Sequence, residues 1–205
     1  ACYARNAFTT LLLAAGDSLD EVQLETENAL EETLDCVAKL SVEALPGCEG
    51  AGVTLRLDGK DMTAAASDEF ALEIDRIQYD SGGGPCVSAL EQGEFQSIEA
   101  VSQETRWPEF CSRAAEKGFR SSISFPLINE GSRGALNLYA KKERAFDEAA
   151  IGIGEIFASQ ASVALRNASI YLAARQLAAQ LNEAVQTRDL IGQAKGILME
   201  REGIT

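Results

Sequence analysis

The feature that most constrains this chain is a long stretch from Asp147 to about Glu202, which contains no proline and repeats every seven residues. Apolar side chains at this spacing are typical of helices that pair in a coiled coil. The repeat is complete at seven positions, which are Ile156, Val163, Ile170, Leu177, Ala184, Ile191 and Leu198. One helix over this range would be roughly 80 Å long and would need a partner, for which a parallel homodimer is the simplest. Two or three shorter helices folded back on one another are the alternative.

The composition of the chain excludes several kinds of chemistry. There is no histidine, which removes the commonest general base and metal ligand, so neither a Ser-His-Asp nor a Cys-His nucleophile can form. The five cysteines form no Cys-x-x-Cys pair, and we interpret them as small side chains of a reduced, cytoplasmic protein. No apolar run approaches the roughly 20 residues that cross a bilayer, so we expect no membrane partner.

Charge is distributed unevenly along the chain. The net charge is −14, but from Arg166 onward five basic residues face four acids, so the excess of acid lies before that point. Phosphates need cations, and only the C-terminal stretch is electrostatically suited to nucleic acid. Between Asp17 and Glu49 ten carboxylates face the single Lys39, which we interpret as the solvated face of a helix.

Two kinds of periodicity precede the long repeat. Helical spacing runs over Asn6–Leu13 and again from Ser18 to Leu45. Alternating side chains predict two hairpins, one over Val53–Ala66 with a turn at Asp58-Gly59, and one over Ile123–Tyr139. Between the hairpins we expect short helices near Gly84–Gln92 and Pro108–Lys117, and a strand at Phe95–Ile98. This order predicts an α+β domain, in which helices flank an antiparallel sheet.

The last twenty residues, from Gln186 to Thr205, continue the helical spacing but add glycine and positive charge. Gly192 and Gly196 lie four residues apart, hence on one face of a helix, where another helix could approach closely. A loose cationic stripe is formed by Arg188, Lys195 and Arg201. The structural alternative is the frayed end of a coiled coil that carries solvated charges.

This stretch resembles the opening of an ANTAR domain, on Arg188, the run Ile191–Arg201 and the closing Gly203-Ile204-Thr205. ANTAR domains are small three-helix RNA-binding modules of bacterial transcription antiterminators. The resemblance implies that Arg188, Lys195 and Arg201 are candidate contacts to an RNA stem-loop. It also implies that this chain carries the first helix of an incomplete module.

The middle of the chain resembles a GAF domain of the kind joined to ANTAR domains in actinobacterial regulators. The residues that carry this resemblance are Pro46-Gly47-Cys48, Ala51–Leu55, Asp75, Gln78-Tyr79, Gly84-Pro85-Cys86, Arg106-Trp107-Pro108, Gly118–Ser121, Pro126-Leu127, Gly134–Tyr139 and Ala145-Phe146-Asp147. GAF domains sense small molecules or mediate interactions, so the resemblance implies an unknown small-molecule or protein signal. The histidine that accompanies a bilin chromophore in such domains is absent.

The physical case for a site centres on the segment from Tyr79 to Cys86. Three glycines lead into a helix whose first residue can be Pro85, and the free N–H groups of a helix start can receive an anion. No lysine follows the glycines, which argues against a nucleotide triphosphate. The candidate ligand-binding residues are Asp75, Gln78, Tyr79, Gly84, Cys86, Trp107 and Phe125. The alternative is a tight glycine loop beside a cysteine that only packs.

These observations favour a non-enzymatic signalling protein without a cofactor or metal. We expect four segments: an N-terminal helical extension (1–17), a GAF sensor domain (18–165), a coiled-coil linker helix (166–185) and the start of an ANTAR domain (186–205). The protein would form a homodimer through its C-terminal helix and bind RNA stem-loops. The alternatives are a thiol-based redox enzyme, such as a GAF reductase of free methionine sulfoxide, and a GAF scaffold that binds only another protein.

Overall fold

The computed structural model describes residues 21–57, 59–129 and 132–202. The predicted helical extension over residues 1–17 and the predicted helix start at Ser18 therefore lie outside the described residues. The chain divides into two compact units, Ala1–Ala168 and Ser169–Thr205, and each is described by itself.

The first unit is built on a five-stranded antiparallel sheet with the order β2-β1-β5-β4-β3. Its strands are β1 (Gly50–Leu57), β2 (Lys60–Ala66), β3 (Gln96–Ile98), β4 (Ser121–Asn129) and β5 (Ser132–Ala140). Both predicted hairpins are present, and Gly59 adopts the positive φ of +76° that the first turn requires. The α+β fold class is confirmed.

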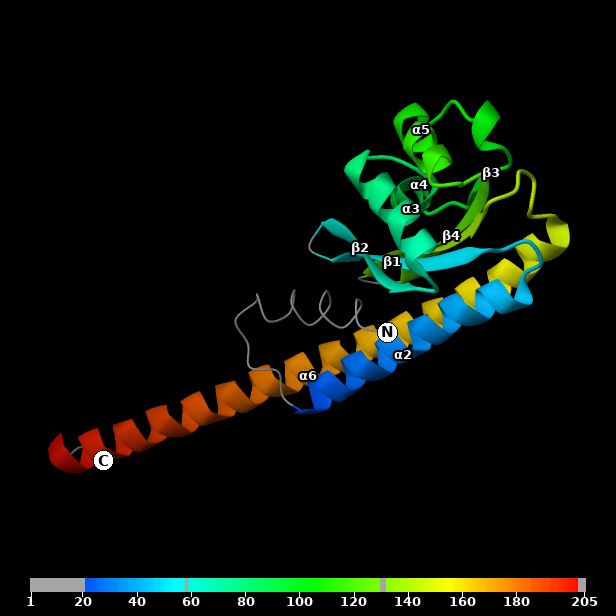
Figure 1. The fold of residues 1–205 in the computed structure, drawn as a ribbon. Coiled ribbons are helices and arrows are strands. Elements are labelled where there is room, and N and C mark those ends of the chain that lie inside the picture. The colour runs from blue at the N-terminus through cyan, green and yellow to red at the C-terminus, as the bar shows by residue number, and fades with distance from the viewer. Residues whose placement is uncertain (1–20, 58, 130–131, 203–205) are drawn as a thin grey trace. The chain divides into compact units, whose positions relative to one another are not determined.

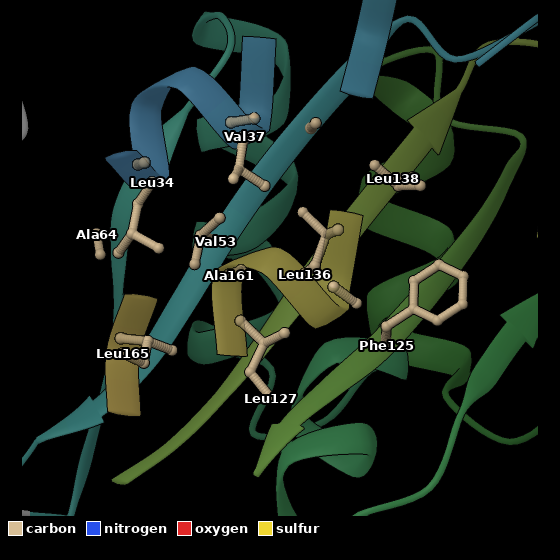
Figure 2. Close-up of a cluster of buried hydrophobic side chains, with 14 of the residues drawn as sticks. Leu34, Val37, Val53, Ala64, Phe125, Leu127, Leu136, Leu138, Ala161 and Leu165 are labelled. Atoms are coloured by element: carbon tan, nitrogen blue, oxygen red, sulfur yellow. The ribbon is translucent and has the colours of Figure 1, made fainter. Parts of the chain in front are cut away.

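Two long helices cover one face of the sheet, namely α2 (Glu21–Ala44) and the first part of α6 (Glu148–Glu202). Their inward side chains meet the apolar side chains of β1, β4 and β5 in a single hydrophobic core (Figure 2). Leu34 and Val37 come from α2, Ala161 and Leu165 from α6, and all four are buried. The strands supply every second residue, as a pleated strand must.

Three shorter helices cover the opposite face, so the sheet lies between two helical layers (Figure 1). They are α3 (Glu69–Asp80), α4 (Pro85–Gln92) and α5 (Pro108–Glu116), and a 3-10 turn, η1, spans Val101–Gln103. The second core on this side includes Ile74, Phe110 and Phe119. The sequence did not predict α3, although Asp68 caps it by accepting a hydrogen bond from the Ala71 backbone N–H.

Helix α6 begins directly after Asp147, where the predicted stretch starts, and Asp147 caps it because its Oδ1 accepts a 2.8 Å hydrogen bond from the Ala150 backbone N–H. The helix runs as one element to Glu202, so shorter helices folded back on one another are not observed. Within the second unit, the exposed large apolar side chains include Ile170, Leu177 and Ile191, all at positions of the seven-residue repeat.

The glycines of α6 provide a test of how closely that helix packs on the sheet. Replacing Gly154 by alanine would place a Cβ 2.5 Å from Phe125 Cε2, so we expect a loss of about 1–2 kcal/mol in the free energy of unfolding. The matched control is Gly152→Ala, where nothing lies within 4 Å and the helix gains roughly 0.5–1 kcal/mol. Urea denaturation measures both, and equal stabilisation by the two changes would contradict the close approach.

Candidate functional site

A buried cluster of polar side chains lies between the sheet and helices α3 and α4. Its members, which we call the polar cluster, are Thr54, Thr63, Asp75, Gln78, Tyr79, Cys86, Asn137 and Tyr139, and hydrogen bonds join all of them. The strands supply the threonines, the asparagine and Tyr139, while α3 and α4 supply the rest. A polar network of this size inside a domain is costly unless its members satisfy one another.

Asp75 is at the centre of the polar cluster and has no solvent exposure. Tyr139 Oη and Asn137 Nδ2 donate to its Oδ1, and Thr63 Oγ1 donates to Oδ2 over 2.9 Å. Burial raises the pKa of the Asp75 carboxyl from 3.8 to about 6, because the three hydrogen bonds offset only part of the desolvation. No cation is among the members of the cluster, so the carboxylate is stabilised by neutral donors alone.

Gln78 joins α3 to both the sheet and α4. Its Nε2 donates to Tyr139 Oη over 2.9 Å, and its Oε1 accepts from the Cys86 backbone N–H over 2.8 Å. The start of α4 is thus capped by a side chain of the same domain. A Cβ on Gly84 would lie 2.5 Å from Gln78 Oε1, so glycine is needed there for this close approach.

Thr54 connects the remaining members of the cluster. Its Oγ1 lies 2.8 Å from Tyr79 Oη, accepts from Asn137 Nδ2 over 3.0 Å and accepts from Cys86 Sγ over 3.1 Å. Burial, followed by the charge of Asp75, raises the pKa of the Tyr79 phenol and of the Cys86 thiol well above their usual values. Both groups therefore stay protonated and act as neutral hydrogen-bond partners.

Three buried side-chain atoms in the described part of the chain have no hydrogen-bond partner, and all three lie on β4 and β5. They are Ser122 Oγ, Ser124 Oγ and Asn137 Oδ1. In the strand register Ser124 is opposite Asn137, and Ser122 is opposite Tyr139. Unpaired donors and acceptors thus continue the polar cluster along the sheet, and such groups are costly when buried.

The structure brings together five of the seven predicted ligand-binding residues, namely Asp75, Gln78, Tyr79, Gly84 and Cys86. A sixth, Trp107, lies next to the glycine loop that leads into α4. Its Cδ1 would be 3.4 Å from a Cβ on Gly83, and the Arg106 guanidinium stacks 4.2 Å from the centroid of its ring. Trp107 therefore borders the site without belonging to the hydrogen-bonded network.

The structure contradicts the prediction that Phe125 belongs to this site. It lies on the opposite face of the sheet, in the core formed with α2 and α6 (Figure 2). The reason is the alternation of strand side chains, which directs Phe125 to one face and Ser124 to the other. The ring of Phe125 packs instead against Phe95, with centroids 5.1 Å apart.

The sequence analysis did not identify four members of the polar cluster as site residues, namely Thr54, Thr63, Asn137 and Tyr139. Thr54, Asn137 and Tyr139 lie at positions that alternate with buried aliphatic side chains along their strands, so they face the side of the sheet opposite the aliphatic core. An asparagine in the middle of such a strand is unusual, because asparagine is depleted in strands. That signal could have identified Asn137, and the same alternation would then have placed Ser124 and Tyr139 beside it.

Three of the cysteines that the structure describes do not have the properties of reactive thiols. Cys48, Cys86 and Cys111 are all buried. Burial raises the pKa of the Cys48 thiol and of the Cys111 thiol to about 11, whereas a nucleophilic cysteine needs a lowered pKa. This physical argument disfavours the thiol-enzyme alternative.

The candidate RNA-binding residues lie in the second unit. Arg188 and Arg201 are exposed, as contacts to phosphates require. The side chain of Lys195 lies outside the described residues. Nothing in the described part of the chain forms a metal-binding group of histidine, cysteine or carboxylate side chains. The described helices also include none long and apolar enough to cross a membrane.

Replacing Asp75 by asparagine tests the buried carboxyl group through the pH dependence of stability. The folded state holds its proton up to a pKa of about 6 instead of 3.8, so protonation stabilises the fold below pH 3.8 and this stabilisation is lost as the pH rises through 6. We expect the wild type to lose about 2 kcal/mol relative to Asp75→Asn between pH 4 and pH 7. Urea denaturation across this range measures the difference, and parallel curves would contradict a raised pKa.

Comparison with solved structures shows the same fold in several proteins of low sequence identity. The GAF domain region of a Geobacter sulfurreducens membrane protein is 16% identical with a TM-score of 0.58, and the match covers 71% of this chain and 98% of that one. A free methionine-R-sulfoxide reductase from Thermoplasma acidophilum is 16% identical with a TM-score of 0.52, and the match covers 66% of this chain and 94% of that one. The phycocyanobilin-bound GAF domain of a cyanobacterial phytochrome is 17% identical with a TM-score of 0.54, and the match covers 76% of this chain and 98% of that one. At such identities the likeness establishes the fold alone.

Two family models match the chain in sequence, whereas no curated protein sequence does. The GAF domain model matches residues 27–166, which include every strand and the whole polar cluster. The ANTAR domain model matches residues 179–205. The chain therefore belongs to the GAF domain family and has the domain architecture of a GAF–ANTAR regulator.

Proposed function

We propose that this chain is the signal-sensing and dimerisation module of an RNA-binding transcription antiterminator. The observation that carries the proposal is the succession of a GAF domain (27–166) and an ANTAR domain (179–205) on one chain. The ANTAR domain would bind stem-loops of a nascent RNA and so prevent a terminator from forming. The GAF domain would set how often it does so.

Helix α6 provides the physical link between the two activities. Its first part is anchored in the GAF domain, where Ala158, Ala161 and Leu165 are buried, and the ANTAR match begins within the same helix. A signal that shifts this anchored part can bias the pairing of the later turns without a separate hinge. In this proposal residues 18–165 form the sensor, 166–185 the linker helix and 186–205 the start of the RNA reader.

The proposed reader is dimeric, through parallel pairing of the C-terminal helix. Ile170, Leu177 and Ile191 occupy the same position of the seven-residue repeat, and 57–64% of the surface of each is exposed. Large apolar side chains at this spacing are stabilised when they pack against an identical row on a partner helix. Two paired readers would then bind two stem-loops of one RNA.

We place the signal at the polar cluster and propose that it is a small uncharged molecule. Asp75 is the single formally charged member of the cluster, so an anion would meet a carboxylate and no cation. The unpartnered Asn137 Oδ1 requires a hydrogen-bond donor, and the hydroxyls of Ser122 and Ser124 can donate or accept. A compact molecule with both N–H or O–H donors and a carbonyl or hydroxyl acceptor fits this set of groups.

Acetamide and acetate are matched probes for this proposal, since they differ in charge and little in shape. Trp107, the single tryptophan of the chain, borders the glycine loop and reports occupancy by its fluorescence. We expect a saturable change with acetamide, a response at least about tenfold weaker with acetate because of Asp75, and loss of the acetamide response in Ser124→Val. An equal or stronger response to acetate would contradict an uncharged signal.

The RNA-binding half of the proposal is tested by charge reversal in the full-length protein. The probe is an RNA with two tandem stem-loops whose loop sequences are randomised. Because phosphate contacts release counterions, Arg188→Glu and Arg201→Glu should each weaken binding about tenfold or more and reduce the slope of log affinity against log salt by roughly 1. Fluorescence anisotropy measures both quantities.

The matched control is Arg113→Glu, which makes the same change of charge on α5 of the GAF domain. Its affinity and salt slope should equal those of the wild type. If the wild-type protein shows no salt-sensitive affinity for any RNA of the pool, the proposed function is wrong.

A further inference from the structure

A row of polar side chains crosses the sheet from the polar cluster to the edge strand β3. Asn137 on β5 is opposite Ser124 on β4, and Ser124 is opposite Gln96 on β3. Side chains that are opposite one another in antiparallel strands share a face of the sheet, with Cβ atoms about 5 Å apart. Strand β3 is the last in the sheet order, so the row leads from the buried cluster to the border of the sheet.

Gln96 closes the row at that border. Its Nε2 donates to Gln92 Oε1 over 3.0 Å, and its Oε1 accepts from Arg106 Nη1 over 3.2 Å. Gln92 is the last residue of α4 and Arg106 precedes α5, and both are exposed. Gln96 itself is 9% exposed, whereas Ser124 and Asn137 are fully buried. The side chain of Gln96 therefore separates the buried part of the row from solvent.

The opposite end of the polar cluster is closed more firmly. Arg56 follows Thr54 by two residues on β1, and so lies on the same face of the sheet. Its guanidinium donates to both carboxylate oxygens of Asp61 on β2, over 2.5 and 2.7 Å, and its Nη2 lies 3.7 Å from Glu91 Oε1 on α4. Bidentate bonds between charged groups are stronger than single bonds between neutral amides, and the bond that Gln96 makes with α4 is of the weaker kind. The Gln96 end is thus the one that opens more readily.

The unpartnered polar atoms lie on the Gln96 side of the polar cluster. Ser122 Oγ, Ser124 Oγ and Asn137 Oδ1 are on β4 and β5, which lie between β3 and β1 in the sheet. On β1, by contrast, Thr54 has hydrogen bonds to three members of the cluster. A molecule that arrives from β3 therefore meets free donors and acceptors before it has to break any bond of the cluster.

We propose that the signal enters the polar cluster along this row and that Gln96 is the gate residue, whose side chain must leave Gln92 before the signal can pass. The inference rests on the proposed function, because it takes the polar cluster as the place where the signal binds, and it adds the route and the residue that controls it. A carboxamide suits this role, since it has both donors and an acceptor. A signal of the same chemistry, such as a primary amide, can replace the hydrogen bond to Gln92 as it passes.

The route is tested by a thiol placed on the row. Ser124→Cys changes an oxygen that has no hydrogen-bond partner, so it removes no bond of the domain. The reagent is methyl methanethiosulfonate, a small neutral molecule, and its rate of reaction with the new thiol, followed by peptide mass spectrometry, measures access to the row. The rate is compared at several low urea concentrations, because access through a small opening is nearly independent of urea, whereas access through unfolding rises with it.

Two changes, each added to Ser124→Cys, weaken the gate. Gln92→Ala removes one neutral hydrogen bond at an exposed position, which should speed up the reaction about two- to tenfold. Gln96→Ala removes both bonds of the gate and should speed it up at least about tenfold, while Arg106 keeps its other bonds. Both changes are neutral, so neither alters the charge around the thiol. The matched control is Gln103→Ala, the same change at an exposed position of η1, which should leave the rate unchanged.

Acetamide tests the same gate in the chain with its native Ser124. Trp107 reports binding, and the Arg106 guanidinium stacked on its ring joins it to the gate. In stopped-flow fluorescence, Gln92→Ala should raise the association and dissociation rates by the same factor, about two- to tenfold, because the gate is closed in both the free and the bound state. A purely structural loss of this hydrogen bond would weaken binding without raising the association rate.

The outcomes separate this inference from the proposed function. If the thiol reacts no faster in the two gate variants than in the control, or reacts only through unfolding by urea, entry past Gln96 is overturned. Saturable acetamide binding with an unchanged association rate in Gln92→Ala overturns it as well. If the thiol reaction depends on the gate as expected but the wild type gives no response to acetamide, the entrance is supported and the uncharged signal is wrong.

Discussion

The alternation of side chains along β1, β4 and β5 is the constraint on which the rest of the structure depends. Val53, Phe125 and Leu136 face one way and are buried under α2 and α6, while Thr54, Ser124 and Asn137 face the other way under α3 and α4. A shift of one residue in any of these strands would exchange the two sets. The same pleat therefore builds a dry apolar core on one side and a buried polar network on the other.

The two faces contribute differently to the protein. The side chains of the apolar face are buried by packing against α2 and the first part of α6, and this packing holds both helices on the sheet. On the polar face, the Asp75 carboxylate is buried with neutral donors as its hydrogen-bond partners, and three further polar atoms of the described residues have no partner. Buried polar groups that only partly satisfy one another are costly, and such cost is commonly retained at sites that bind or switch.

Much of the fold could be predicted from the sequence, because both hairpins and the start of α6 have strong local signals. Helix α3 was missed because its 12 residues are too few to show a long apolar repeat. A single capping residue, Asp68, marks its start. Asp75 and Gln78 were predicted through a family resemblance, whereas Tyr79, Gly84 and Cys86 were also indicated by the glycine run that leads into a helix. Phe125 was misplaced because the alternation of its strand, which puts it on the face opposite Ser124, was not applied to the choice of site residues. Asn137 was missed because a list of motif residues does not say which face of a strand each one occupies.

The burial of three cysteines has a consequence for the dynamics of the GAF domain. Cys48 precedes β1, Cys86 is in α4 and Cys111 is in α5, so each thiol lies in a different part of the fold. A thiol reagent can reach them only when that part opens. Their separate labelling rates would thus report, in one unmodified protein, which layer of the domain loosens first when conditions change.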